Sequence, residues 1–279
     1  MKKTVAIINF NTPELTEAAI LSLRKHGGED YKVVVFDNSA DIDFPATDGL
    51  PERKAKARPF TKKMKGVQVI NNRKGQVIDF QKMLAEYPDK NPRHAIVNDW
   101  GSMKHIWTVQ KLWELLPDGF VLMESDILLK RSIDGFFREE YSVVGYHQHQ
   151  QPGNKFGIGR MLPMLCWMNV PMLTREGARY FDPERTYGLL PGGRQNINNW
   201  YDTGAVLLAD ILANRPRLIG RHVDIRLFVE HYGSGSWQNN DKAQQVVWLE
   251  QHRDLWEMPK ENKSGNRIRR KTTKKSEKL

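Results

Sequence analysis

The first 37 residues constrain the fold most strongly, because two apolar segments flank an amphipathic one. Residues 4–10 and 31–36 are rich in Val and Ile, the composition of buried strands. Between them, Thr12 is an expected N-cap, Pro13 suits the first helical turn, and the helix should end near Gly27. Strand, helix and strand over this length predict a βαβ unit, whose right-handed crossover makes the two strands parallel.

The remaining apolar patterns predict an α/β fold. Strands are expected at residues 67–70, 120–123, 141–147 and 227–232, and helices at 78–86, 102–116, 174–180 and 203–212. Thr174 is the expected cap of its helix, whereas residues 155–170 show no clear period. We therefore expect a mostly parallel sheet flanked by helices, with a mixed second half.

Charge and cysteine content limit the classes of partner. The single cysteine, Cys166, excludes an internal disulfide and a thiolate-rich metal site. The net charge is +10, and residues 260–279 contain nine basic and two acidic residues with almost no apolar side chain. Such a tail is expected to be disordered and attracted to anionic lipid or nucleic acid, although it lacks aromatic residues for base stacking. A second basic segment, Arg53–Lys65, is expected to be a mobile loop.

The sequence also predicts where the protein works. No apolar run approaches the roughly 20 residues that a membrane-spanning helix needs, and no signal peptide is recognisable. We expect a cytoplasmic protein, with peripheral contact to the inner face of the membrane through the basic tail.

Polar residues gather where predicted strands end. Three clusters follow three of these strands: Asn9-Phe10-Asn11-Thr12, Asp37-Asn38-Ser39 and Glu124-Ser125-Asp126. In open α/β sheets, ligands bind beyond the carboxyl ends of the strands, and carboxylates spaced by one residue can hold a divalent cation against a pyrophosphate. Each cluster alone could instead be a turn or a helix cap, so their coincidence is what predicts a nucleotide site.

Several of these motifs resemble those of family 2 glycosyltransferases, which have the GT-A fold. Residues 5–15 resemble the opening of that family, and residues 36–39 resemble the Asp motif that contacts the uracil of a UDP-sugar. Residues 122–128 resemble the metal-binding DxD motif and its strand. Gly101 and Ser102, with His105, resemble the segment before that motif, residues 201–204 an acceptor-side segment, and residues 230–237 a late His motif.

The resemblance implies a function and a set of site residues. It implies transfer of a sugar from a UDP-sugar to a saccharide or lipid-linked acceptor, with inversion, with Mn²⁺ or Mg²⁺, and in the synthesis of cell-surface polysaccharide. It implies one GT-A domain over residues 1–258, with a nucleotide-binding half (1–130) and an acceptor-binding half (131–258), before the basic tail (259–279). The residues implied to bind the nucleotide-sugar are Asn9, Asn11, Thr12, Asp37, Ser39, Gly101, Ser102, Glu124 and Asp126.

Two departures from the family pattern affect the chemistry. The first acidic position of the DxD-like motif is Glu124, one methylene longer than Asp, while Asp126 keeps the position that ligates the metal. The family's paired acidic motif for the general base is not evident, so Asp202 is our candidate, although it could simply cap the following helix. His231 is the candidate that completes the metal site, with a structural role as the alternative.

Two other functional classes share part of this pattern. A nucleotidyltransferase also combines an α/β sheet with acidic residues and a cation, but typically has an early Gly-rich loop with Arg and Lys. Here the first strand is followed by Asn-Thr-Pro-Glu. A non-catalytic nucleic-acid-binding protein would instead use the basic tail.

Overall fold

The computed structural model describes residues 3–44, 53–86, 102–148, 159–182, 189–190, 194–195, 203–213, 217–233 and 242–258. Its centre is a seven-stranded sheet in the order β12-β8-β9-β6-β1-β2-β5. The strands are β1 (Thr4–Asn9), β2 (Lys32–Asp37), β5 (Val67–Asn71), β6 (Phe120–Glu124), β8 (Val143–Gln148), β9 (Arg160–Met168) and β12 (Gly220–His222). Only β9 runs against the other six. The predicted fold class, a mostly parallel sheet flanked by helices, is confirmed.

The opening βαβ unit forms as predicted. Helix α1 (Pro13–Gly27) connects β1 to β2, and the two strands pair in parallel from Thr4↔Lys32 to Asn9↔Asp37. Successive side chains of β1 are buried on opposite faces, with Ala6 in one hydrophobic cluster and Val5 in the other. A parallel sheet covered on both faces requires such a continuously apolar strand.

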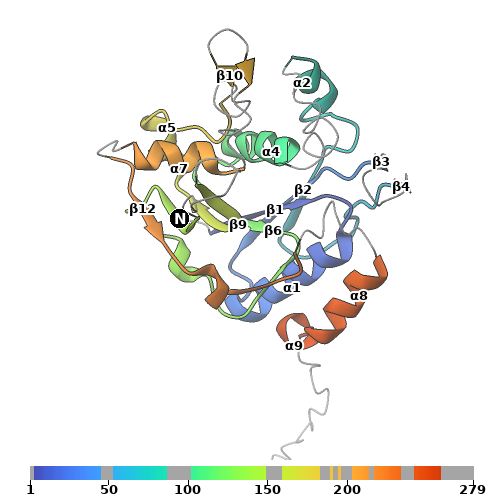
Figure 1. The fold of residues 1–279 in the computed structure, drawn as a ribbon. Helices are drawn as coiled ribbons and strands as arrows, with labels where there is room; N and C mark the ends of the chain where they lie inside the picture. The colour runs from blue at the N-terminus through green and yellow to red at the C-terminus, as the bar shows by residue number, and fades with distance from the viewer. Residues whose placement is uncertain are drawn as a thin grey trace, which may run out of the picture.

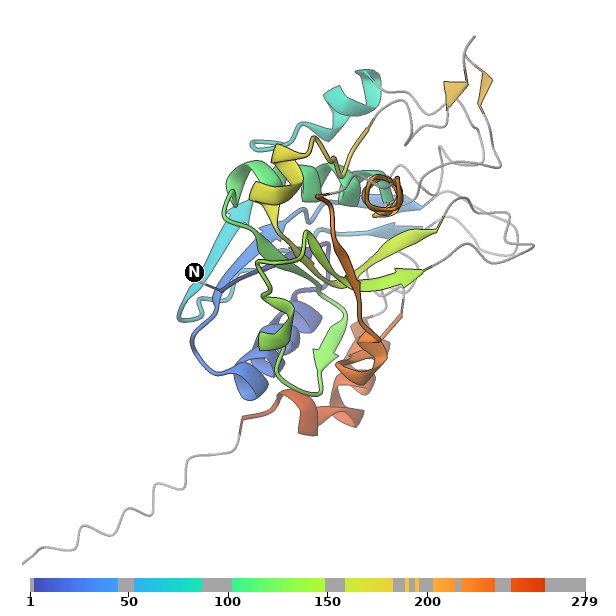
Figure 2. The ribbon, with the colours of Figure 1, turned by 90° about the vertical axis from the view of Figure 1, so that its left-hand side faces the viewer.

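Helices cover both faces of the sheet (Figures 1 and 2). One face carries α4 (Ser102–Leu115) and α7 (Ala205–Leu212). The other carries α1, against which α8 (Lys242–Gln251) and α9 (Arg253–Trp256) pack. Two shorter helices, α2 (Phe80–Glu86) and α5 (Val170–Arg175), and two 3-10 turns, η1 (Asp134–Phe136) and η2 (Ile225–Leu227), complete the described helices.

Three two-stranded ribbons lie outside the main sheet. Strand β7 (Ile127–Leu129) pairs with β13 (Val229–His231), β3 (Ile42–Phe44) with β4 (Arg53–Ala55), and β10 (Leu189–Leu190) with β11 (Arg194–Gln195). The β7–β13 ribbon is antiparallel, and His231 pairs with Ile127. Ile127 directly follows Asp126 in the sequence, so the pairing brings His231 to the carboxylates at the end of β6. This ribbon joins the first and second halves of the chain at the carboxyl edge of the sheet.

The sequence did not predict β9, although it is the longest strand of the sheet. Pro163 lies inside it, and proline cannot donate a hydrogen bond to a neighbouring strand. The structure accommodates it with an irregularity: one residue of β8, Tyr146, faces four residues of β9, because Gly145 pairs with Cys166 while His147 pairs with Met161. Burial alternates from Arg160 to Leu165, but the sequence there is apolar almost throughout, so its hydropathy shows no alternation.

Several predicted boundaries and caps are wrong. The helix expected to start at Thr174 is α5, which ends at Arg175 and is capped by Asn169, whose side chain accepts from the amide of Met172. Thr12 precedes α1 but makes no side-chain capping bond. Among the described residues, no helix is both long enough and apolar enough to cross a bilayer.

Gly204, the residue before α7, sits where a side chain does not fit. Its φ is +79°, and a Cβ there would lie 2.1 Å from the carbonyl oxygen of Met161 at the start of β9. Gly28, after α1, also has a positive φ, +75°, but a Cβ there would meet no described atom within 4 Å. Both glycines have a positive φ, but only Gly204 has no room for a side chain. Comparing substitutions at the two positions therefore separates backbone strain from steric overlap.

We predict that Gly204→Ala lowers the free energy of unfolding by about 4 kcal/mol, because strain and a clash with backbone add. Gly28→Ala should cost only about 1–3 kcal/mol, the strain of a side chain at φ +75° and ψ −162°, a conformation almost exclusive to glycine. Chemical denaturation of both variants measures the difference, and equal losses would contradict the close contact between α7 and β9.

Candidate functional site

The carboxyl ends of β1 and β2 meet in a buried hydrogen-bond network. The Asn9 amide donates from Nδ2 to Asp37 Oδ1 at 2.8 Å and to Ser39 Oγ at 2.9 Å. Asn9 Oδ1 accepts from the hydroxyl of Thr16 at 2.8 Å, with that of Thr12 at 3.5 Å. Both ends of the Asn9 amide are therefore bonded within the protein, so Asn9 organises this edge, and its predicted contact with a nucleotide-sugar stays a prediction.

Asn11 is also an organising residue. Its φ is +59°, and it is the single described residue other than glycine with a positive φ. Its Nδ2 donates to the carbonyl of Ala40 at 2.8 Å, and its Oδ1 accepts from the amide of Arg58 at 2.9 Å. Asparagine tolerates this conformation because its short polar side chain can bond locally to backbone. The resemblance implied a ligand contact for Asn9 and Asn11, whereas the structure satisfies both side chains internally.

Asp37 is arranged differently. It is 2% exposed, and its Oδ1 accepts three hydrogen bonds, from Asn9 Nδ2 and from the amide and hydroxyl of Ser39. No described residue donates to its Oδ2. This oxygen is not among the fully buried side-chain atoms of the described residues that lack a hydrogen-bond partner, so a ligand or water can reach it. Asp37 is therefore the residue of this edge best placed to receive a donor from a bound molecule.

The second centre of the site is formed by Glu124, Asp126 and His231. One ligand atom from each of the three side chains lies within 4.8 Å of the others. A divalent cation held about 2.1 Å from each atom needs separations of up to about 4.2 Å, so small side-chain rotations suffice. Two carboxylates and an imidazole are also a donor set that suits Mn-class cations. The residues thus fit the metal that the sequence predicted.

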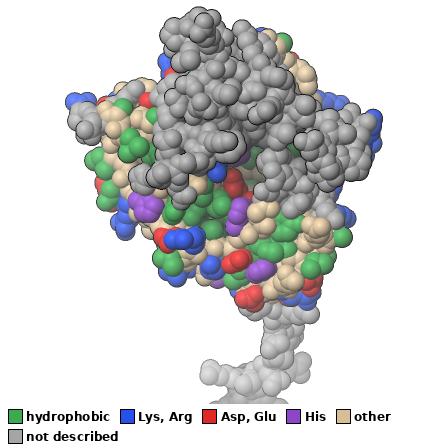
Figure 3. Space-filling model, viewed as in Figure 1, with side chains coloured by type: hydrophobic (Ala, Val, Ile, Leu, Met, Phe, Trp, Pro, Cys, Tyr) green, Lys and Arg blue, Asp and Glu red, His purple; other side chains and the backbone are tan. Residues whose placement is uncertain are grey.

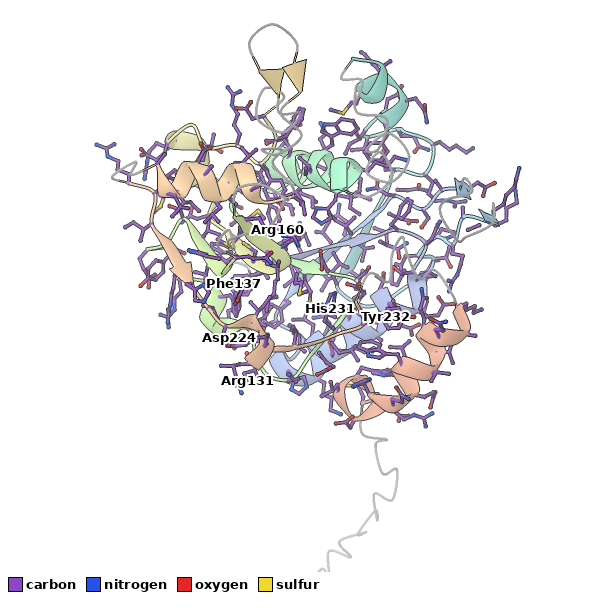
Figure 4. All side chains as sticks on the ribbon, viewed as in Figure 1. Arg131, Phe137, Arg160, Asp224, His231 and Tyr232 are labelled. Carbon is purple, nitrogen blue, oxygen red and sulfur yellow. The ribbon has the colours of Figure 1, made fainter. Side chains whose placement is uncertain are left out.

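Backbone pairing holds this metal group together. The amide of Tyr232 donates to the carbonyl of Asp126 at 2.9 Å, which continues the β7–β13 ladder to the end of β6. His231 Nε2 then lies 3.5 Å from Asp126 Oδ2. Figure 3 shows acidic and histidine side chains next to one another near the middle of this face, and Figure 4 labels His231 there.

The electrostatic field at this point favours positive charge. Burial lowers the pKa of His231, but its hydrogen bond to Asp126 and the charges of Asp126, Glu124 and Glu230 outweigh burial. The pKa of His231 is consequently raised above its ordinary value of 6.5. A group of carboxylates that attracts a proton to the imidazole attracts a divalent cation for the same reason.

Two hydroxyls link the two centres. Thr12 Oγ1 lies 3.1 Å from the hydroxyl of Ser125, the residue between the two metal-group carboxylates. Thr12 also approaches Asn9, which is bonded to Asp37. The expected capping hydroxyl of Thr12 is therefore turned away from its helix and toward the site.

The other predicted site residues divide into two groups. Gly101 and Asp202 lie outside the described residues, and Ser102 is the first residue of α4. Helix α7 begins at Ala205 with Gly204 at its N-cap, so Asp202 precedes the cap and does not occupy it. The neighbouring Thr203 is held by His105 Nδ1 at 2.9 Å and by the Tyr180 hydroxyl at 3.1 Å.

Sequence reasoning named Asn38 and Ser125 only as members of the strand-end clusters, and it missed Asn72 and Arg58. Asn38 donates to Thr108 of α4 at 2.8 Å and accepts from Asn72 at 3.0 Å, and Ser125 and Arg58 contact Thr12 and Asn11. The position of Asn38 and Asn72 at neighbouring strand ends was a usable signal. For Arg58 there was none, because its partners Ser39, Glu14 and Asn11 lie 19, 44 and 47 residues away.

The fold has counterparts among known structures, whereas the sequence has none: no family model and no curated protein matches it. The galactosyltransferase LgtC, solved with donor and acceptor sugar analogues, is similar over 92% of this chain and 98% of its own, with a TM-score of 0.51 and 12% identity. The fold is that of a GT-A glycosyltransferase. Membership of family 2 stays a prediction.

Two further glycosyltransferases are more distant in structure. GlyE of Streptococcus pneumoniae TIGR4 has a TM-score of 0.42 and 12% identity, over 93% of this chain and 61% of its own. The mannosyltransferase PcManGT of Pyrobaculum calidifontis, in complex with GDP-Man and Mn²⁺, has a TM-score of 0.40 and 12% identity, over 91% of this chain and 64% of its own.

We predict that Asp126→Asn abolishes stabilisation by Mn²⁺, because the amide keeps the shape but loses the charge that attracts the cation. At about 100 times its dissociation constant, Mn²⁺ should stabilise the wild type by about 2.7 kcal/mol. Thermal unfolding with and without Mn²⁺ measures this.

The matched control is Glu230→Gln, which removes one charge beside His231 but lies outside the metal group, where Glu230 faces Lys130 at 3.6 Å. The Glu230→Gln variant should keep most of the Mn²⁺-induced shift in melting temperature. A full Mn²⁺ shift in Asp126→Asn would show that the cation binds elsewhere.

Proposed function

We propose that this chain is a metal-dependent glycosyltransferase that moves a sugar from a UDP-sugar to a saccharide or lipid-linked acceptor. The observation that carries the proposal is the metal group of Glu124, Asp126 and His231 at the same edge of a GT-A sheet as the buried Asp37. LgtC, which shares this fold, was solved with donor and acceptor sugar analogues. The shared fold supports the proposal, and the arrangement of the residues gives it chemical content.

The spacing of the two centres matches a nucleoside diphosphate. Along β1, Ile8 pairs with Glu124 on one side and Asn9 pairs with Asp37 on the other. The two acidic residues are thus at nearly the same height and two strand spacings apart, roughly 10 Å. A nucleotide lying across the end of β1 would place its base at one centre and its diphosphate at the other.

The acceptor oxygen of Asp37 favours uracil as the base. Its Oδ2 can accept one hydrogen bond, and the N3–H of uracil is a single donor flanked by carbonyl groups. Ser39 and Asn9 hold the carboxylate in place through Oδ1. The buried surroundings make this bond stronger than it would be in water.

The metal group would act on the leaving diphosphate. A divalent cation held there supplies Lewis-acid stabilisation of the charge that develops as the bond to the sugar breaks. Asp126 and His231 approach each other to 3.5 Å, and Glu124, one methylene longer than Asp, has the longer reach to a ligand oxygen or a ribose hydroxyl. The side chains are fixed before the reaction by the β7–β13 pairing, which is the kind of preorganisation that transition-state stabilisation needs.

The acceptor side of the proposal depends on Asp202. This carboxylate would take the proton from the acceptor hydroxyl as that oxygen attacks the anomeric carbon, and such a single displacement inverts the configuration. The hydroxyl of Thr203, the next residue, is bonded to His105 and Tyr180, and this anchor beside Asp202 supports the proposal. The cationic tail fits an acceptor at the cytoplasmic face of a membrane, and a role in cell-surface polysaccharide synthesis would follow.

We predict that UDP with Mn²⁺ stabilises the wild type more than ADP, GDP or CDP with Mn²⁺. Asp37→Asn should lose most of the preference for UDP, because an amide can present a donor to uracil N3–H. Asp41→Asn is the control. Asp41 also follows β2, but its carboxylate is exposed and accepts a hydrogen bond from Lys56. Thermal shift with each nucleotide measures the effect, and equal stabilisation by all four would contradict recognition of uracil.

We predict that Asp202→Asn keeps affinity for UDP and Mn²⁺ but lowers kcat by about 10²–10⁴-fold, the usual contribution of a general base. Turnover of a UDP-sugar panel, read as released UDP, measures kcat, and NMR of the product reports the anomeric configuration. An Asp202→Asn enzyme with full kcat would remove Asp202 from the chemistry, and failure of every UDP-sugar with wild type would count against the function itself.

A further inference from the structure

The basic segment that precedes β5 is fastened along α1. Phe60 is 3% exposed and packs in the hydrophobic cluster beneath β1 and β2. On either side of it, Arg58 pairs with Glu14 and Lys62 pairs with Glu17, one helical turn further along α1. The expectation of a mobile loop is therefore wrong for this part of the segment, whose apolar anchor and two ion pairs follow the helix.

The backbone of Arg58 enters the nucleotide edge itself. Its amide donates to Asn11 Oδ1 at 2.9 Å, and its carbonyl lies 2.9 Å from the hydroxyl of Ser39. Pro59 follows it, and a residue before proline is restricted to extended conformations. An extended residue presents its amide and its carbonyl to the same side. On that side the Asn11 amide donates to the Ser39 hydroxyl at 3.1 Å, so Arg58 bonds to both segments where they meet.

The side chain of Arg58 ties that bridge to two helices. One guanidinium nitrogen bonds to Glu14 in the first turn of α1, and another lies 3.5 Å from Oε1 of Gln245, which is fully buried in α8. The other Glu14 oxygen lies 3.6 Å from Lys242 of α8. Glu14 is a favourable partner, because the N-terminus of a helix stabilises negative charge.

We infer that Arg58 is a positioning residue for nucleotide binding. It holds the side chains of Asn11 and Ser39 in place and, through Ser39, it orients the carboxylate of Asp37. The inference rests on the proposed function. Ser39 has one hydroxyl proton and two acceptors, Asp37 Oδ1 at 2.7 Å and the Arg58 carbonyl at 2.9 Å, so the position of residue 58 affects the bond that orients Asp37. The guanidinium clamp on α1 and α8 fixes that position.

The test compares Arg58→Met with Lys62→Met. Both variants remove one positive charge from the same segment and one ion pair with α1, but the described contacts of Lys62 do not include Asn11 or Ser39. Isothermal titration with UDP in saturating Mn²⁺, and with Mn²⁺ alone, is carried out on both variants and on wild type. The temperature is kept well below the melting point of each variant, so that loss of folding does not contribute.

Arg58→Met should weaken UDP about tenfold, the scale of losing one charge-assisted contact. It should leave the Mn²⁺ affinity and the kcat at saturating donor unchanged, because the metal group lies on the other side of β1. Lys62→Met should bind UDP as wild type does. The exchange Arg58→Glu with Glu14→Arg should recover part of the affinity lost in Arg58→Glu alone, since it restores the ion pair.

Unchanged UDP affinity in Arg58→Met, equal losses in both single variants, or a matching loss of Mn²⁺ affinity would overturn the inference. A wild-type protein that does not bind UDP would instead overturn the proposed function, so the two failures are distinguishable.

Discussion

The candidate site depends on one backbone pairing, the antiparallel contact of β13 with β7. It brings His231, from late in the chain, beside Asp126, and the bond from the Tyr232 amide to the Asp126 carbonyl continues the pairing to the end of β6. The pairing also explains why the carboxylates can be fixed at all. Like charges repel when they are close, and a ladder of backbone hydrogen bonds supplies restraint that does not depend on the charges themselves.

The strand-end cluster at β1 and β2 follows a complementary rule. There, polar residues are numerous, but most of them satisfy one another: Asn9 uses both ends of its amide, Asn11 does the same, and Ser39 joins them to Asp37. Buried polar groups must be hydrogen-bonded, so a site cannot consist only of residues that wait for a ligand. The internal network is what leaves one acceptor, Asp37 Oδ2, in a defined position.

The sequence predicts the fold well where one period dominates. The βαβ unit of β1, α1 and β2 and the strand β6 are continuously apolar segments bounded by polar residues, and their parallel order follows from chain chirality. It fails at β9, where a nearly unbroken apolar run contains Pro163 and hides the alternating burial of Arg160–Leu165. Tertiary pairing decides such a strand, and a single sequence does not contain that information in local form.

The site shows the same limit in another way. Spacing and strand ends predicted Asp37, Glu124, Asp126 and His231, since their residue types carry the chemistry. The distinction between Asn9, which is satisfied internally, and Asp37, which keeps an open acceptor, depends on partners distant in sequence. Arg58 is the clearest case, because a basic segment reads as a solvated loop until Asn11, Ser39 and Glu14 are seen around it. Candidates for the chemistry can be predicted from residue type and spacing. Candidates for positioning them are recognised only from long-range contacts, which form only when the chain folds.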